Sequence, residues 1–236
     1  MEQWETALLK VLQRRRTVDQ AFEAIAKAAD DLGFRWCAYG CQHPLPFTRR
    51  RIFLISNYAP SWQARYAEAG YLRVDPTVAH ARGSLQPVLW NDATFQPAPQ
   101  LWEEAKASGL RYGWAQACFG PDGSIGLLSL SRDSDSLGRL ELRAKQVRLR
   151  FLVNVTHATL SPLVRLQQEP QMTSLTPQEL QVLRWSADGK SSEATAELMD
   201  LSLHTVEFHI KNAVRKLGAS SRAAATARAA AIGLLR

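Results

Sequence analysis

The stretch GWAQACFGPDGSIGLLSLSR, residues 113–132, decides the fold class of the larger part of this 236-residue chain. Two runs with strand character flank PDGS, residues 121–124, whose Asp-Gly pair suits the tight turn of a β-hairpin. The earlier runs FRWCAYG, residues 34–40, and RIFLISNY, residues 51–58, have the same character. These four runs predict a β-sheet in the middle of the chain.

Helical patterns precede, interrupt and follow these strands. Apolar residues recur at helical spacing over residues 4–33, where Thr17 can cap the second of two helices. Residues 59–70 and 100–110 read as helices between the strands, and residues 140–166 read as a long closing helix. This order of elements predicts an α/β/α sandwich, in which helices cover both faces of a mixed sheet.

The pattern changes after residue 165. Residues 166–174, LQQEPQMTS, are polar and aperiodic and contain a proline, as linkers commonly do. No strand pattern follows them. We therefore expect two domains joined by this linker, an α/β domain over residues 1–165 and an all-α domain over residues 175–236.

Helix signals divide the second domain into four short helices. Thr176 and Glu179 form a capping box at the first helix, which Gly189 ends. Ser202 can cap the third helix and Ser221 the fourth. Such an arrangement is typical of a helix-turn-helix unit, whose recognition helix enters the major groove of DNA, although other small helical domains carry similar caps.

The third helix, LHTVEFHIKNAVRKLG at residues 203–218, has an apolar face and a basic face. Val206 and Ile210 belong to the apolar face, which we expect to pack against the other helices. The side chains that we expect to face outward are those of Thr205, Lys211, Arg215 and Lys216.

Residues 175–236 resemble the DNA-binding domain of the LuxR family. The resemblance rests on the leading Leu175-Thr176, the Gly189-Lys190 turn, the run Thr205-Val206-x-x-His209 and the terminal Gly233-Leu234. It implies that the third helix is the recognition helix of a homodimer on a roughly palindromic promoter site. The DNA-contact residues that it implies are His204, Thr205, Glu207, Lys211, Arg215 and Lys216.

Two positions depart from the family pattern. The second helix has Ala194-Thr195 where the family usually has Glu-Ile, which removes a large apolar side chain from the packing. Glu207 takes a position that is often basic, and a carboxylate can accept from cytosine N4 but is repelled by phosphates. We therefore expect a looser second helix and an affinity or sequence preference that differs from the usual pattern.

A further stretch, NYAPSWQARYAEAGYLRVDP at residues 57–76, places Tyr58, Trp62 and Tyr66 close to Asp75. Tyrosine and tryptophan bury well once their polar tips find partners, so an aromatic corner of the core beside a solvated aspartate explains the stretch as well as a binding site does. The residues alone leave both interpretations open.

The same stretch resembles the ligand domain of the acyl-homoserine-lactone receptors within the LuxR family. Further matches are Trp90, Gly113 and IGLLSLS at residues 125–131. The resemblance implies a mostly apolar pocket with a few placed polar groups. Asp75 would then accept a hydrogen bond from the amide N–H of the lactone, and Trp62 would donate one to the ring carbonyl.

The resemblance implies roles for six further residues of the pocket. The hydroxyls of Tyr58 and Ser129 would donate to the amide carbonyl, while Tyr66 and Trp90 would form walls. Ala38 and Phe95 would lie along the acyl tail, where the small Ala38 leaves room for a medium or long chain.

Composition restricts the remaining possibilities. No apolar run approaches the roughly 18 residues that span a bilayer, so we expect a cytoplasmic protein with no membrane contact. Cys37, Cys41 and Cys118 lack metal-site spacing and read as reduced core thiols, and no motif indicates a metal or cofactor. The formal net charge is +7, but only 8 Lys and Arg against 6 Asp and Glu lie from Leu175 onward, so charge alone does not locate a DNA site.

The expected function is that of a quorum-sensing transcriptional regulator whose partners are an acyl-homoserine lactone, promoter DNA, a second copy of the chain and RNA polymerase. One alternative keeps the DNA-binding domain but makes the first domain a protein-binding module without a ligand. A second alternative is an acyl-transfer enzyme that uses Ser129 and a histidine. We expect no enzyme, because no base lies near Ser129 in the sequence and no G-x-S-x-G motif occurs.

Overall fold

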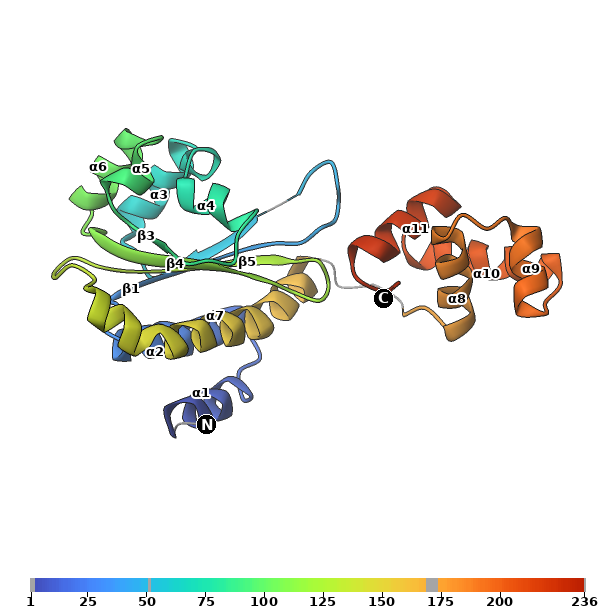
Figure 1. Ribbon diagram of the computed structural model, residues 1–236, viewed down its shortest axis with the longest axis horizontal. Helices are drawn as coiled ribbons and strands as arrows, with labels where there is room; N and C mark the ends of the chain where they lie inside the picture. The colour runs from blue at the N-terminus through green and yellow to red at the C-terminus, as the bar shows by residue number, and fades with distance from the viewer. Residues whose placement is uncertain (1–2, 51, 169–173, 236) are drawn as a thin grey trace. The chain divides into compact units, whose positions relative to one another are not determined.

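The computed structural model describes residues 3–50, 52–168 and 174–235. The chain forms two compact units, one built on residues before Leu166 and the other mainly on Leu166 and the residues after it. The first unit is a β-sheet with helices on both faces, as the sequence predicts, and the second contains four helices among its described residues (Figure 1). The α/β/α class of the first unit is confirmed.

The sheet has five strands in the order β2-β1-β5-β4-β3, and every neighbouring pair is antiparallel. The prediction of a mixed sheet is therefore wrong. The helices that follow β2 do not join neighbouring parallel strands but lead across one face of the sheet to the opposite edge strand, β3. The strands are β1 (Trp36–Gln42), β2 (Ile52–Ser56), β3 (Val88–Leu89), β4 (Tyr112–Phe119) and β5 (Ile125–Arg132).

One face of the sheet packs against helices from the two ends of the first unit. These are α2 (Val18–Asp31) and α7 (Arg139–Gln168), which lie along the sheet in Figure 1, while α1 (Gln3–Leu12) packs against α2. Thr17 caps α2 as predicted, since its side chain accepts from the Gln20 backbone N–H at 3.3 Å. Cys37 and Cys41 are buried in this core, whereas Cys118 is half-buried and lies 3.3 Å from the Asn154 side-chain oxygen.

The other face is covered by a series of short helices (Figure 1). Only the first and last of them have enough turns to show a periodic pattern, and the sequence does not predict the others. Their aromatic residues form a second, smaller core. The helices are α3 (Pro60–Glu68), η1 (Tyr71–Arg73), α4 (Pro76–Ala81), α5 (Asp92–Phe95) and α6 (Pro99–Ala107).

The second unit consists of α8 (Pro177–Ala187), α9 (Ser192–Met199), α10 (Leu203–Lys216) and α11 (Arg222–Ala231). The capping box of α8 and the serine caps of α10 and α11 form as predicted. The two units divide at Arg165 and Leu166, where the predicted linker begins, and α7 continues to Gln168, three residues into that linker; residues 169–173 lie outside the described residues. None of the described helices is both long enough and apolar enough to cross a membrane.

Candidate functional site

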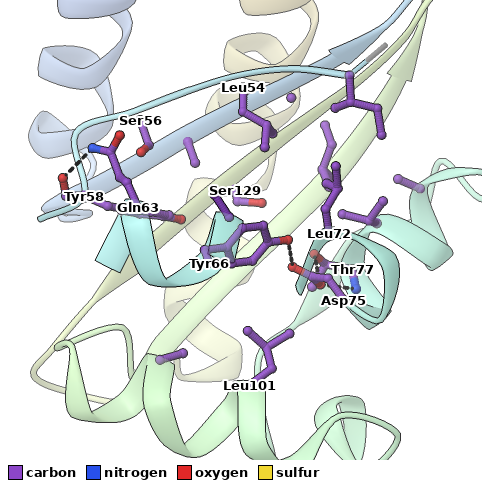
Figure 2. Close-up of a pocket in the computed structure, with 18 of the residues that line it drawn as sticks. Leu54, Ser56, Tyr58, Gln63, Tyr66, Leu72, Asp75, Thr77, Leu101 and Ser129 are labelled. Carbon is purple, nitrogen blue, oxygen red and sulfur yellow. Dashed lines mark hydrogen bonds between the residues drawn. The ribbon is translucent and has the colours of Figure 1, made fainter. Parts of the chain in front are cut away.

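A cavity of about 880 Å³ lies between the sheet and the short helices of the first unit (Figure 2). Its lining comes from β1, β2 and β5 on one side and from α3, η1, α4 and α6 on the other, and most of it is apolar. The structure brings all eight predicted ligand residues into this one lining, namely Ala38, Tyr58, Trp62, Tyr66, Asp75, Trp90, Phe95 and Ser129. The cavity is in the size range of pockets for small organic ligands.

The floor of the cavity is set by strand register. Ala38 in β1 lies opposite Ser56 in β2 and opposite Ser129 in β5, so the three side chains share one face of the sheet. All three are small, which keeps the floor open. Ser129 is nearly buried and brings its hydroxyl to the lining.

Asp75 is the N-cap of α4, with Pro76 at the first helical position. One carboxylate oxygen accepts from the Thr77 backbone N–H at 2.8 Å and from the Thr77 hydroxyl at 2.7 Å. The other accepts from the Tyr66 hydroxyl at 2.8 Å (Figure 2). A carboxylate has about four acceptor positions, so Asp75 has one position left for a further donor.

Tyr66 has a contact that the sequence does not predict. It lines the cavity, as expected of a wall residue, and its hydroxyl also donates to Asp75 and orients that carboxylate. Burial, followed by the nearby Asp75 charge, raises the pKa of Tyr66, so its hydroxyl keeps its proton at neutral pH. Burial likewise raises the pKa of Tyr58, which therefore stays a donor.

Two aromatic groups enclose the helical side of the cavity. Trp62 is buried and packs edge-on against Tyr66, with 6.0 Å between the ring centroids. Phe95 lies edge-on to Trp90 at 5.8 Å and stacks on Trp102 at 4.6 Å. The rings hold one another in place, which fixes the shape of the site before a ligand enters.

Sequence reasoning missed several residues of the lining. Thr77 holds Asp75 through both its backbone and its hydroxyl, and Gln63 donates to the Tyr58 carbonyl at 2.7 Å (Figure 2). The run Asp75-Pro76-Thr77 contains a readable signal, because aspartate followed by proline is a common helix start. The apolar residues that complete the lining include Leu54, Leu72, Val78, Ala81, Leu101 and Leu127.

In the second unit, α10 exposes five side chains that are polar, charged or aromatic. His204, Glu207, Phe208, Lys211 and Arg215 are all exposed. The opposite side of the helix is buried through Val206 and Ala213. The helix has the two faces that the sequence predicts, with Lys211 and Arg215 exposed as expected, and Phe208 joins the exposed face.

Comparisons with known proteins give a family match for each of the two units. The family model described as "Autoinducer binding domain" matches residues 17–160, and the model described as "Bacterial regulatory proteins, luxR family" matches residues 173–229. The chain is 37% identical over its whole length to the transcriptional activator protein AnoR of Acinetobacter nosocomialis, which it also covers completely. The chain belongs to the LuxR family of quorum-sensing transcriptional regulators.

Other relatives match this LuxR-family regulator over nearly its whole length. It is 32% identical to the quorum-sensing regulator RhlR of Pseudomonas aeruginosa, with 98% of this chain and 96% of the relative covered. The crystal structure of Escherichia coli SdiA matches with a TM-score of 0.84 at 32% identity and covers 99% of this chain and 98% of that one. A structure of SdiA in complex with octanoyl-rac-glycerol matches with a TM-score of 0.82.

The structure contradicts one predicted orientation in α10 of the regulator. Lys216 does not face outward, because its ammonium group donates to Glu179 at 2.8 Å and to the Ser174 carbonyl at 3.2 Å. Only 15% of the Lys216 side chain is exposed. Its long stem turns back onto α8, which helical periodicity does not predict. Thr205 is half-buried, and its hydroxyl lies 2.8 Å from that of Ser202.

The departure at Ala194-Thr195 is accommodated within α9. Thr195 is fully buried, and its hydroxyl donates to the Ser191 carbonyl at 2.7 Å. Ser191 also caps the helix through its side chain. Internal hydrogen bonds therefore satisfy the polar group that takes the usual isoleucine position.

We expect Gly113→Ala to disturb the cavity of this regulator. A Cβ at Gly113 would clash with the ring of Trp90, so the ring must move, at a cost of at least about 1 kcal/mol in unfolding free energy. Urea unfolding and ligand titration measure the two effects. Gly83→Ala is the matched control, because a Cβ there has no neighbour within 4 Å. Equal stability of the two variants would contradict the placement of Trp90.

We expect Glu207→Lys to strengthen binding to every DNA sequence. It replaces a charge repelled by phosphates with one that releases counterions, so the plot of log affinity against log salt concentration steepens by about 1. Titration of cognate and scrambled duplexes at several salt concentrations measures this. Glu197→Lys on α9 makes the same charge change at another exposed position and should have a smaller effect. Unaltered non-specific affinity of Glu207→Lys would show that this face does not approach DNA.

Proposed function

We propose that this regulator binds an N-acyl-homoserine lactone in the cavity and then, as a cytoplasmic homodimer, binds a roughly palindromic promoter site. The observation that carries the ligand assignment is the hydrogen bonding of the Asp75 carboxylate. Its carboxylate already accepts three hydrogen bonds and lines the cavity with one acceptor position left. An acyl-homoserine lactone has one N–H group to donate.

The other polar groups of the lining complement the rest of the lactone. Trp62 has only a donor and suits the ring carbonyl, while the Tyr58 and Ser129 hydroxyls suit the amide carbonyl. The acyl tail would run over the floor at Ala38 and past Phe95. A cavity of about 880 Å³ has room for a medium or long tail.

An acylglycerol is the alternative ligand class, since SdiA has been solved with octanoyl-rac-glycerol. A glycerol hydroxyl can donate to Asp75, but an ester linkage has no N–H group. In a lactone ligand, the amide nitrogen next to the acyl carbonyl can donate a hydrogen bond to Asp75. In an acylglycerol, the ester oxygen takes that position and has no hydrogen to donate. This difference favours the lactone.

Neither rival function receives support from the site. An acyl-transfer mechanism at Ser129 needs a base, and none of the described residues that line the cavity is a histidine. The relatives are transcriptional regulators. A protein-binding module without a ligand does not need a carboxylate that is held by three hydrogen bonds at the edge of a large cavity.

Ligand binding would act on transcription by mass action. A lactone that binds only the folded first unit stabilises it in proportion to the logarithm of its concentration, and so raises the amount of dimer available to DNA. Two basic side chains of α10, Lys211 and Arg215, would contact bases or phosphates, with His204, Thr205 and Glu207 beside them. RNA polymerase would be recruited from the bound promoter.

Expression with a panel of lactones and monoacylglycerols tests the ligand assignment. We expect soluble yield to rise with lactones of one range of chain lengths, and mass spectrometry of the extracted protein to recover the intact lactone. Recovery of an acylglycerol from cells supplied with both would overturn the lactone assignment. Soluble, DNA-binding protein that carries no extractable ligand would support the ligand-free module, and turnover products would support an enzyme.

A further inference from the structure

Phe208 is an exposed aromatic residue on the solvent-facing side of α10. Phe208 is 57% exposed. Its ring contacts the ring of the neighbouring His209, with 5.7 Å between the two centroids. A phenyl ring in water gives up the stabilisation that burial would provide. The ring is thus available to a partner that covers it.

The position of Phe208 along the helix points to the class of partner. His204, Phe208, Lys211 and Arg215 follow one another at intervals of four, three and four residues, so they form one stripe along the helix surface. All four are exposed. The two permanent cations of the stripe complement a polyanion, and the family to which the chain belongs binds DNA through this unit.

The chemistry of the ring narrows the partner to one base. Phenylalanine has no hydrogen-bonding group, and the apolar feature that a base edge presents in the major groove is the C5-methyl group of thymine. Glu207, the preceding residue, is an acceptor that suits cytosine N4, and Lys211, three residues on, is a donor that suits guanine. This surface of the helix therefore carries three different base-reading chemistries within about one and a half turns.

We propose that Phe208 reads the methyl group of a thymine in each half-site of the operator, as a sequence-determining contact of the recognition helix. The contact adds specificity without adding charge. It is distinct from the phosphate and hydrogen-bonding contacts that we expect of Lys211, Arg215 and Glu207, and it does not depend on which ligand fills the cavity.

Selection from randomised duplexes tests the proposal, because it requires no assumed operator sequence. The full-length protein is used, together with its Phe208→Ala and Phe208→Leu variants. We expect the wild-type motif to contain a thymine position in each half-site, and Phe208→Ala to lose the preference at that position while it keeps the preferences elsewhere. Phe208→Leu, which retains an apolar side chain, should keep much of the thymine preference.

Replacement of that thymine by uracil in one half-site removes only one methyl group. We expect the wild-type affinity to fall about fourfold, as burial of one methyl-sized group predicts, and the affinity of Phe208→Ala to be unchanged by the replacement. Leu198→Ala is the matched control, since Leu198 is 52% exposed on α9 and does not belong to the stripe. This variant should respond to uracil as the wild type does.

The possible results separate the proposal from the DNA-binding function on which it rests. A wild-type protein that selects no sequence would contradict the function of the unit as a whole. A wild-type motif that is kept in full by Phe208→Ala, or an equal response of both proteins to uracil, overturns the thymine contact alone. An equal loss of affinity on all sequences would place the ring against the sugar-phosphate backbone or a second copy, and would also overturn it.

Discussion

Asp75→Asn is expected to weaken lactone binding by about 1.5–3 kcal/mol, the range for a hydrogen bond to a charged group, which corresponds to a roughly 10- to 150-fold higher Kd. The substitution keeps the size of the side chain but exchanges a charged acceptor for a neutral amide. Asparagine is also a good N-cap, so α4 should remain intact. Isothermal titration with lactones of several chain lengths measures the effect.

A matched variant separates the charge from the surrounding network. Tyr66→Phe removes one of the three donors to Asp75 but leaves its charge in place, so it should cost less than Asp75→Asn. An Asp75→Asn protein with wild-type affinity would remove Asp75 from the ligand site. A loss of affinity that is the same for a lactone and for its ester analogue would mean that the amide N–H is not the group that Asp75 binds.

Lys216→Met is expected to lower the unfolding free energy of the second unit by about 3 kcal/mol, because it leaves the carboxylate of Glu179 buried without its ionic partner. Lys211→Met removes an exposed lysine from the same helix and should change stability little. Urea unfolding of the full-length variants measures both. If Lys216 faced outward, as the sequence predicts, the two variants would be equally stable and both would bind DNA less tightly.

The ion pair between Lys216 and Glu179 also makes the stability of the second unit depend on pH. Burial alone would raise the pKa of Glu179, but the hydrogen bonds from Lys216 and Thr176 outweigh it and hold the pKa below its ordinary value. The pair therefore contributes stability above about pH 4.5, and this contribution is lost as the pH falls through the lowered pKa. In a Lys216→Met protein this acid-dependent contribution should be largely absent.

The parts of the molecule that the sequence predicts are those fixed by local chemistry. The capping box at Thr176 and the cap at Thr17 depend on residues three positions apart, and both form as expected. The hairpin of β4 and β5 follows from its Asp-Gly turn in the same way. The short elements η1, α4, α5 and β3 have too few residues for a periodic pattern, although Asp75-Pro76 is a start signal for α4.

The cavity depends on contacts that no local pattern contains. Ala38 and Ser129 are brought together by strand register, and Asp75 meets Tyr66, nine residues earlier, from its position as the N-cap of a short helix. Resemblance to a family selected these residues, whereas the physical chemistry of the stretch left the alternatives open. The direction of the Lys216 side chain could not be predicted from helical periodicity either. A flexible side chain near the end of a helix can turn toward a partner on another helix, here Glu179 on α8.

The double role of Asp75 has a consequence for the design of biosensors from this protein. The carboxylate that we assign to the ligand head group also starts α4, so changes there alter the scaffold together with the selectivity. The strand residue Ala38 makes no such structural bond through its side chain, and it lies on the open floor. Libraries that retune the sensor toward other acyl chains should therefore vary the floor and leave the head-group end constant.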